Sequence, residues 1–313
     1  MANELKIQPV IANVSATRHI LKHFNLRASK RLGQNFLIDK SIVDDIVNAA
    51  EIEEGEQVLE IGPGIGTLTQ GLLEAGANVT AVELDKKLPA VLNETLAGYE
   101  NFRLIQGDIL KVDINQIMSD EDFSLLPTHP PSLRKNPPTF KVVANLPYYI
   151  TSQIILTLLE KKLPITKLVT MVQREVAERM VATPESLAAN KESAKTYGSL
   201  SVAVQFYTEP HIAFDVPLSA FLPSPEVTSS VIVCDVRETP AVDVTDEKLF
   251  FRVVRGAFGQ RRKTLINSLA GAGFNREELS IALQKSNIDS SRRAETLSLE
   301  DFAALSNALK GGD

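Results

Sequence analysis

The residue types best suited to chemistry stand together in Asn145, Leu146, Pro147 and Tyr148, directly after the apolar run KVVA. A strand ending at Asn145 would hold its side-chain amide at the open edge of a sheet, and we expect the carbonyls of Leu146 and Pro147 to face the same crevice. Pro147 has a fixed φ and no N–H, so this turn is stiff. With the flat face of Tyr148, these groups suit a planar ring that carries an exocyclic amino group. They form the expected catalytic set, and an ordinary strand-to-turn junction is the alternative.

A glycine-rich turn lies upstream of this set. The apolar strand VLEI runs into Gly62, Pro63, Gly64 and Gly66, and leucines at helical spacing follow. Glycine permits tight turns and close approach by a ligand. Dinucleotide folds carry G-x-G-x-x-G and hold a diphosphate at a helix N-terminus, whereas this turn reads G-x-G-x-G. An acidic residue, Glu60, precedes it and would repel a diphosphate, so the pattern favours a ligand with an ammonium or sulfonium group, such as S-adenosylmethionine.

Acidic residues follow the next two predicted strands. Glu83 comes about 20 positions after the first glycine, a spacing that suits a carboxylate bound to a ribose diol. Asp108 follows the strand FRLIQ and suits an adenine amino group. Each carboxylate alone could simply be solvated. Because Gly62, Glu83, Asp108 and Asn145 follow successive strands, however, we expect one ligand site that they share.

Alternating strand and helix patterns must position these groups. The predicted strands are 57–61, 79–84, 102–106, 141–145 and 167–173, and the predicted helices are 41–50, 67–75, 86–97 and 151–160. This alternation predicts a mainly parallel sheet covered on both faces, which binds ligands outside the carboxyl ends of its strands.

The rest of the chain is less regular. We expect a helix from 173, a helix over 199–207, strands at 210–216 and 229–237, and helices throughout 247–308. The segment 119–140 holds five prolines and little periodicity, so it is interpreted as an inserted loop rather than a flap over the substrate. A boundary is expected near 238–246.

Composition limits the class of protein. The chain has 313 residues, 44% of them hydrophobic, and its single cysteine, Cys234, excludes a disulfide framework. There is no apolar run of about 18 residues and no secretory leader pattern, so we expect a cytoplasmic protein without a membrane partner. The four histidines are scattered and no G-x-S-x-G occurs, which predicts neither a metal site nor a nucleophilic triad.

Positive charge is concentrated locally although the net charge is −6. Arg261, Arg262 and Lys263 follow Phe258 closely, and a second group lies at 27–31. Neutralisation of phosphates needs a basic face, not a basic whole protein. The triplet is therefore the expected RNA-binding element, with solvated helix ends as the alternative.

Long motifs, in order, carry a family resemblance. They are KRLGQNFL (30–37), VLEIGPGIGTLT (58–69), AVELD (81–85), GD (107–108), VVANLPYYI (142–150), QREVAERM (173–180), YGSLSVAVQ (197–205), FLPSPEVTSSV (221–231) and FGQRRKTL (258–265). Over about residues 25–308 the chain resembles the KsgA-type ribosomal RNA small-subunit adenine dimethyltransferases, relatives of the Erm resistance methyltransferases.

The resemblance implies S-adenosylmethionine-dependent dimethylation of the N6 amino groups of two adjacent adenines near the 3′ end of small-subunit (16S) rRNA. The implied cofactor-binding residues are Asn35, Leu37, Gly62, Gly64, Glu83, Asp108 and Asn145. The base would contact Asn145, Leu146 and Tyr148, with Phe221 as a second stacking partner. Inside a paired helix the amino group is out of reach, so the target adenine must be single-stranded or splayed from its stack.

The resemblance also implies domains and partners. We expect an N-terminal extension (1–26), a Rossmann-like α/β methyltransferase domain (27–240) and a small all-helical C-terminal domain (241–313). The expected substrate is rRNA in an immature 30S particle, bound by a monomer, with no DNA partner. The chain departs from the family pattern in the extension, in 119–140 and in 183–196, and none of these interrupts a motif.

Other functions share part of this pattern. An Erm-like enzyme would methylate 23S rRNA, and a non-catalytic rRNA-binding assembly factor would keep the fold without the reaction. A DNA adenine methyltransferase would use an Asn and a Tyr in the same roles, but it would also need a domain that recognises duplex DNA. A dehydrogenase is disfavoured by the glycine spacing and by Glu60.

Overall fold

The computed structural model describes residues 10–119, 139–189 and 196–311. The chain divides into two compact units. The first unit comprises Met1–Arg174 and His211–Asp235, and the second comprises Glu175–Pro210 and Val236–Asp313. The domains expected from the sequence (1–26, 27–240 and 241–313) stay a prediction.

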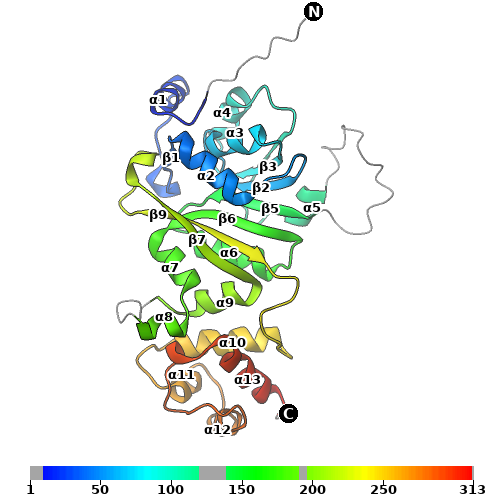
Figure 1. Ribbon diagram of the computed structural model, residues 1–313, viewed down its shortest axis with the longest axis vertical. Helices are drawn as coiled ribbons and strands as arrows, with labels where there is room; N and C mark the ends of the chain where they lie inside the picture. The colour runs from blue at the N-terminus through cyan, green and yellow to red at the C-terminus, as the bar shows by residue number, and fades with distance from the viewer. Residues whose placement is uncertain (1–9, 120–138, 190–195, 312–313) are drawn as a thin grey trace, which may run out of the picture. The chain divides into compact units, whose positions relative to one another are not determined.

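A seven-stranded sheet forms the first unit's centre (Figure 1). In spatial order its strands are β4 (Phe102–Gln106), β3 (Asn78–Glu83), β2 (Gln57–Ile61), β5 (Phe140–Asn145), β6 (Ile165–Gln173), β9 (Ser229–Val236) and β7 (Thr208–Val216). The strands from β4 to β6 are parallel, and β9 runs antiparallel to β6. The prediction of a mainly parallel α/β sheet is confirmed.

The order of the strands creates a crevice between β2 and β5. The chain adds β3 and β4 on one side of β2 and then returns to add β5 and β6 on the other side. At such a reversal the connections leaving the two neighbouring strands diverge, and ligands bind at their carboxyl ends. Gly62 follows β2 and Asn145 ends β5, so both flank this point.

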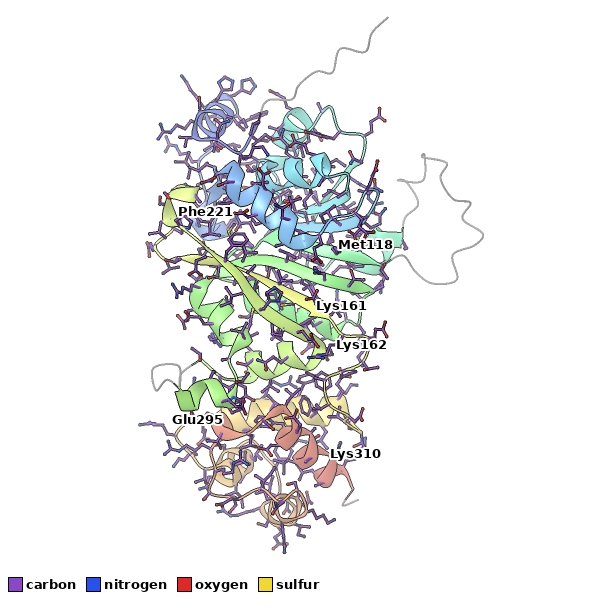
Figure 2. The ribbon with its side chains drawn as sticks, viewed as in Figure 1. Met118, Lys161, Lys162, Phe221, Glu295 and Lys310 are labelled. Carbon is purple, nitrogen blue, oxygen red and sulfur yellow. The ribbon has the colours of Figure 1, made fainter. Side chains whose placement is uncertain are left out.

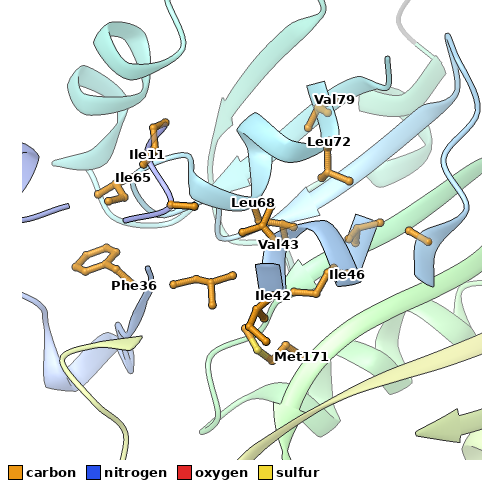
Figure 3. Close-up of a cluster of buried hydrophobic side chains, with 14 of the residues drawn as sticks. Ile11, Phe36, Ile42, Val43, Ile46, Ile65, Leu68, Leu72, Val79 and Met171 are labelled. Carbon is orange, nitrogen blue, oxygen red and sulfur yellow. The ribbon is translucent and has the colours of Figure 1, made fainter. Parts of the chain in front are cut away.

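Three helices cover one face of the sheet: α2 (Lys40–Ala50), α3 (Thr67–Glu74) and α4 (Leu88–Thr95). Helix α2 begins after Asp39, whose carboxylate accepts the Ser41 N–H and so caps the helix. Its apolar side buries Val43 and Ile46 in a cluster that also holds side chains of α3 and of the sheet (Figure 3). This core fixes the strand ends that carry the site. Helix α6 (Thr151–Glu160), which follows the Asn145 turn, was predicted with the same bounds.

Several elements were not predicted from the sequence. They are α1 (Val14–His23), α5 (Ile114–Ser119), α8 (Pro184–Ala189) and the short antiparallel pair β1 (Phe36–Leu37) and β8 (Phe221–Leu222). The two strands and helices α5 and α8 have only two to six residues, which are too few for periodicity to stand out. Helix α1 has ten residues, and its helical spacing was overlooked. Residues 120–138, most of the predicted inserted loop, lie outside the described residues, as do residues 1–9 of the extension and residues 190–195 of the departure at 183–196.

The second unit is built mainly from helices. They are α7 (Arg174–Val181), α8, α9 (Ser199–Tyr207), α10 (Glu247–Phe258), α11 (Leu265–Gly271), α12 (Arg276–Lys285) and α13 (Leu299–Lys310). Phe206 of α9 stacks on Phe250 of α10 with ring centroids 4.9 Å apart and meets Phe251 edge to face at 5.2 Å. Among all the helices in the described ranges, none is long and apolar enough to cross a membrane.

Candidate functional site

A pocket opens at the carboxyl ends of the parallel strands, within the first unit. Its walls come from the segment before α2 and from the turns after β2, β3, β4 and β5. The lining residues are Leu32, Gly33, Gln34, Asn35, Phe36, Leu37, Glu60, Ile61, Gly62, Pro63, Gly64, Ile65, Thr67, Leu68, Val82, Glu83, Leu84, Leu88, Gly107, Asp108, Ile109, Asn145, Leu146, Pro147, Tyr148, Tyr149, Ile150 and Ile154. The pocket therefore brings together every residue expected to bind cofactor and the whole expected catalytic set.

The glycine turn gives this pocket a backbone wall. Gly62, Gly64 and Gly66 have φ angles of 70°, 61° and 94°, a region that side chains rarely adopt. A Cβ built on Gly62 would meet nothing within 4 Å. Glycine is therefore needed here both for the turn and for the open space, which lets a ligand approach the main chain closely.

Glu60 is a buried acid at the base of the pocket. Its side chain is 1% exposed, and Oε2 has no hydrogen-bond partner among the described residues. Burial raises the pKa of Glu60 to about 8; the nearby Thr69 hydroxyl opposes this rise, and the nearby charge of Glu83 adds to it. An unpartnered buried acceptor is costly, so this oxygen is suited to a donor or cation that enters with a ligand.

Glu83 faces the glycine turn in a fixed orientation. Its Oε1 accepts the Asp85 N–H at 2.6 Å and its Oε2 accepts the Gly64 N–H at 3.4 Å. Burial raises the pKa of Glu83, and these two N–H groups oppose the rise. The carboxylate is thus held at the end of β3 by the main chain on both sides.

Asp108 is the more exposed acid of the site. Its Oδ1 accepts the Leu110 N–H at 3.1 Å, and Lys111 Nζ lies 3.5 Å from Oδ2. Both contacts hold the carboxylate at the rim beside Gly107, which also lines the pocket.

The segment before α2 is tied to the strand ends. The Gln34 amide donates to Asp85 Oδ2 at 2.9 Å and accepts the Ser29 N–H at 2.8 Å. The Asn35 carbonyl accepts from Asn145 Nδ2 at 3.4 Å, across 110 residues of sequence. These bonds make the segment a wall of the pocket, and they give Gln34 a structural part that the sequence did not reveal.

Asn145 is half-buried at the end of β5. Because its Nδ2 donates to Asn35, its Oδ1 is the end of the amide left for a ligand, and no group of the described residues donates to it. The neighbouring Leu146 N–H donates to the Met171 carbonyl at 3.2 Å, which holds the turn to β6. The Leu146 carbonyl accepts no hydrogen bond from the described part of the chain.

The carbonyl of Pro147 is engaged elsewhere. It accepts the Thr151 hydroxyl at 3.0 Å and the Ile150 N–H at 3.2 Å, which close the first turn of α6. The expectation that this carbonyl faces a ligand is therefore wrong, because both of its lone pairs are used. What Pro147 brings to the pocket wall is a rigid turn.

Tyr148 lines the pocket and is anchored by its hydroxyl group. This oxygen lies 2.6 Å from Ser229 Oγ, and Ser229 is fully buried at the start of β9. Burial raises the pKa of Tyr148, and the bond to Ser229 opposes this rise. Sequence reasoning missed Ser229, because it lies 81 residues away and no local pattern links it to the turn.

Tyr149 stands at the rim of the pocket and is 60% exposed. A Cβ on Gly33 would lie 3.5 Å from its ring, so the absence of a side chain there gives the ring its place. The residue was not among those expected to function.

Two sets of expected residues lie outside the pocket. Phe221, labelled in Figure 2, is 2% exposed, pairs with Leu37 in the β1–β8 ladder and belongs to the hydrophobic core. Its ring offers no open face to a base in this structure, so its stacking role stays a prediction. The exposed Arg261, Arg262 and Lys263 lie between α10 and α11 in the second unit. Within the described ranges, no cluster of His, Cys, Asp and Glu side chains is arranged to hold a metal ion.

Comparison with known proteins adds independent findings. The family model described as ribosomal RNA adenine dimethylase matches residues 25–310. The chain is 43% identical over 300 residues to "Ribosomal RNA small subunit methyltransferase A" of Clostridioides difficile strain 630, covering 96% of both proteins. It is 46% identical over 300 residues to the protein of that name from Moorella thermoacetica, covering 96% of this chain and 99% of the relative.

Solved structures share the fold at lower identity. A dimethyladenosine transferase from Plasmodium falciparum has a TM-score of 0.67 at 24% identity, covering 86% of this chain and 95% of its own. The 23S rRNA methyltransferase ErmE has a TM-score of 0.61 at 24% identity, covering 88% and 100%. These likenesses support the Rossmann-like methyltransferase architecture.

Proposed function

The chain belongs to the ribosomal RNA adenine dimethylase family, and from that premise we propose that it dimethylates the N6 amino groups of two adjacent adenines near the 3′ end of 16S rRNA. The methyl donor in this proposal is S-adenosylmethionine. Relatives at 43–46% identity carry the name of a small-subunit methyltransferase, which favours 16S over 23S rRNA. The Erm-like alternative has only a likeness of fold in its support.

One observation carries the catalytic part of the proposal. The Asn145 amide lines the same pocket as the glycine turn, and its donor end is bonded to the Asn35 carbonyl. That bond gives the side chain one orientation, in which Oδ1 is the acceptor presented to a ligand. A non-catalytic assembly factor would have no need of such an oriented acceptor.

The pocket suits S-adenosylmethionine by its own chemistry. Glu60 offers a buried, unpartnered oxygen to a cationic group, and Gly62 leaves open space beside the main chain. Glu83 and Asp108 provide acceptors for ribose hydroxyls and for an adenine amino group. When bound, this cofactor supplies a methyl group already activated by its sulfonium.

The protein's own groups would prepare the nitrogen that receives the methyl group. An adenine amino group is a weak nucleophile because its lone pair is delocalised into the ring. Hydrogen bonds from its two hydrogens to Asn145 Oδ1 and the Leu146 carbonyl would localise that pair on nitrogen. Stacking on Tyr148 would fix the plane of the ring, and such stacking contributes on the order of 1–3 kcal/mol. Most of the acceleration would come from in-line positioning, for which ~7–11 kcal/mol of barrier is available.

Dimethylation sets a further requirement. After the first transfer the amine retains one hydrogen, so one of the two acceptors is released while the other still orients the nitrogen. The Pro147 carbonyl is already bonded by Ile150 and Thr151, so it is not one of these acceptors. The released proton can pass to water, and no strong general base is required.

The partner and setting belong to the same proposal. We assign the substrate to rRNA in an immature 30S particle, bound by a monomeric enzyme in the cytoplasm. The separate roles of Arg261, Arg262 and Lys263 in binding phosphates, and of Phe221 in stacking, are proposed from the family resemblance.

A methyl-transfer assay tests this function. Purified protein and tritiated S-adenosylmethionine are incubated with unmethylated immature small subunits, deproteinised 16S rRNA, large subunits and duplex DNA. Incorporation into small-subunit material at N6,N6-dimethyladenosine is expected, and Asn145→Ala serves as the inactive control. Labelling of large subunits in preference would contradict the assignment, and binding without any labelling would support the assembly-factor alternative.

A further inference from the structure

Helix α1 and the segment after it carry charge of one sign. Between Val10 and Ile38 the sequence holds five Lys or Arg residues and no Asp or Glu, in a chain whose net charge is −6. Arg18, His19, Lys22 and His23 of α1 are all exposed. Such a concentration is unusual for a solvated surface, where both signs are normally interspersed.

The helix is firmly seated on the first unit. Its start is fixed by the Ile11 N–H, which donates to the buried Gln70 amide at 2.9 Å, and by the Asn13 cap. Thr17 is fully buried, and Ile20, Leu21 and Phe24 pack against the hydrophobic core. Since these residues share one face of the helix, Arg18 and Lys22 are presented on the opposite face together with His19 and His23. Helix α1 is therefore a rigid carrier of this charge.

The positions of the positive charges on α1 are not explained by their effect on the stability of the helix. Arg18 and Lys22 are four residues apart, where like charges destabilise a helix slightly. Lys22 and His23 lie in the last turn and gain from the helix dipole, but Arg18 lies in the second turn and does not. His23 lies 3.6 Å from Glu94 of α4, and within the described residues neither Arg18 nor Lys22 forms an ion pair. Local rules broken without compensation often mark a functional surface.

The chain connects this surface directly to the pocket. Exposed Arg27 and Arg31 follow α1, and the next residues, Leu32 to Leu37, line the pocket wall. Ser29 and Gln34 are bonded to each other, and Gln34 is bonded to Asp85 at the site. A strand of nucleic acid that places one base in the pocket would thus find positive charge along the adjoining wall.

We propose that the basic face of α1, defined by Arg18, His19, Lys22 and His23, docks the sugar-phosphate backbone of the RNA that flanks the target adenines. The inference rests on the proposed function for the identity of the nucleic acid. The bonds it predicts go to phosphates, so they contribute affinity and register without base specificity. They would add to any contacts of the Arg261–Lys263 triplet in the second unit.

The salt dependence of RNA binding tests this proposal. The variant Arg18→Gln/Lys22→Gln removes two charges and keeps good helix formers. The matched control, Lys161→Gln/Lys162→Gln, removes two charges from the same unit after α6 (Figure 2). The probe is a fluorescently labelled RNA hairpin with two adjacent adenines in its loop, and anisotropy gives its Kd over a range of salt concentrations. Thermal melting verifies that each variant is folded.

The expected result is a shallower plot of log Kd against log salt for the α1 variant. Loss of two phosphate contacts reduces the slope by about 1.4–1.8, because each contact contributes ~0.7–0.9. The control should retain the slope of the unaltered protein, and Arg18→Glu/Lys22→Glu should weaken binding further. An unchanged slope in the α1 variant overturns the proposal.

Two outcomes separate this inference from the proposed function. If the unaltered protein methylates no RNA yet the α1 variant shows the reduced slope, the docking surface stands and the catalytic assignment fails. If the α1 variant binds the hairpin normally but loses affinity for whole small subunits, the surface docks a ribosomal protein and the RNA proposal is wrong.

Discussion

The two ends of the parallel sheet differ in whether their charged groups have partners within the protein. At the amino ends of β5 and β6, both strand lysines have partners: Lys141 Nζ bonds the Glu51 carbonyl at 2.7 Å and Glu56 at 2.9 Å, and Lys167 bonds Glu51 and, at 3.2 Å, Asp235. At the carboxyl ends, Glu60 is buried with an unpartnered oxygen, and three glycines hold positive φ angles.

The pKa shifts at the two ends show the same contrast. Burial works to lower the pKa of Lys167, but its bonds to Glu51 and Asp235 outweigh this and raise it. The pKa of Glu51 is lowered in turn by its bond to Lys167. At the other end, burial dominates and raises the pKa of Glu60 to about 8. The lysines at the amino ends are thus paired within the protein, whereas the carboxyl ends keep a buried acceptor without a partner in the described residues.

Removing a charge from the satisfied end should give the largest loss of stability. Lys141 is 8% exposed, so Lys141→Ala removes the positive charge beside Glu56, which keeps the Glu53 N–H, and removes a donor to the Glu51 carbonyl. Loss of one member of a buried pair costs about 3–5 kcal/mol, and the partial exposure of Glu56 places this case at the lower limit. Urea unfolding measures the change, and S-adenosylmethionine affinity measured well below the unfolding midpoint should be unaltered. A large loss of S-adenosylmethionine affinity in folded Lys141→Ala protein would contradict the distinction between a structural end and a ligand-binding end of the sheet.

Removing the carboxylate of Glu60, at the carboxyl ends of the strands, should have the opposite effects: higher stability and weaker cofactor binding. The folded-state pKa of Glu60, about 8, lies above its ordinary value of 4.5, so the folded protein binds the proton more tightly than the unfolded chain does. The free energy of unfolding should therefore fall as pH rises from about 4.5 to about 8. Glu60→Gln removes this dependence and should raise stability at pH 7 by on the order of 3 kcal/mol, while weakening cofactor binding.

Urea titrations of both proteins between pH 4 and pH 9 provide the test of the Glu60 account. The two curves should converge near the acid limit and separate as pH rises. Parallel curves would show that Glu60 is not the titrating group. Cofactor affinity adds a second readout, since a cation bound beside Glu60 must displace its proton and binding should strengthen with pH.

The Tyr148–Ser229 pair should produce a smaller effect. Tyr148→Phe removes the hydroxyl group and leaves the buried Ser229 oxygen without its partner, which costs about 1 kcal/mol and a few-fold in kcat through a less fixed ring. Ser229→Ala should have a similar effect. Tyr148→Ala should be worse than either, because it removes the stacking face.

A double-mutant cycle distinguishes positioning from hydroxyl chemistry. The Tyr148→Phe/Ser229→Ala protein should be no worse than either single variant, because neither polar group is then stranded. A severe loss with Tyr148→Phe that Ser229→Ala does not reproduce would mean that the hydroxyl takes part in the reaction.

The sequence predicted the sheet because its signals are local. The strands β2 and β4 and the helices α6 and α9 were predicted with the bounds observed, since each is a periodic or apolar run between turn residues. The same logic placed Gly62, Glu83, Asp108 and Asn145 at one pocket, because residues that follow neighbouring parallel strands meet at one edge.

What the sequence could not predict depends on contacts between distant residues. The bonds Asn145–Asn35, Tyr148–Ser229 and Gln34–Asp85 join segments 110, 81 and 51 residues apart. The burial of Phe221 is likewise set by packing, whereas the hydrogen bonds of the Pro147 carbonyl are local, from Ile150 and Thr151. Helix α1 lies in the predicted extension, and the helical spacing of Ile20, Leu21 and Phe24 is a local signal that could have revealed it.

The central claim is that the Asn145 amide, oriented by Asn35, prepares the adenine amino group for methyl transfer. The most direct test is the single-turnover rate of methyl transfer to unmethylated small subunits by Asn145→Ala, with the Kd for S-adenosylmethionine measured on the same protein. We predict a rate lower by about 100-fold or more, the size typical of a lost catalytic hydrogen bond, with the cofactor Kd changed only several-fold. A variant that transfers methyl groups at the unaltered rate would contradict the account.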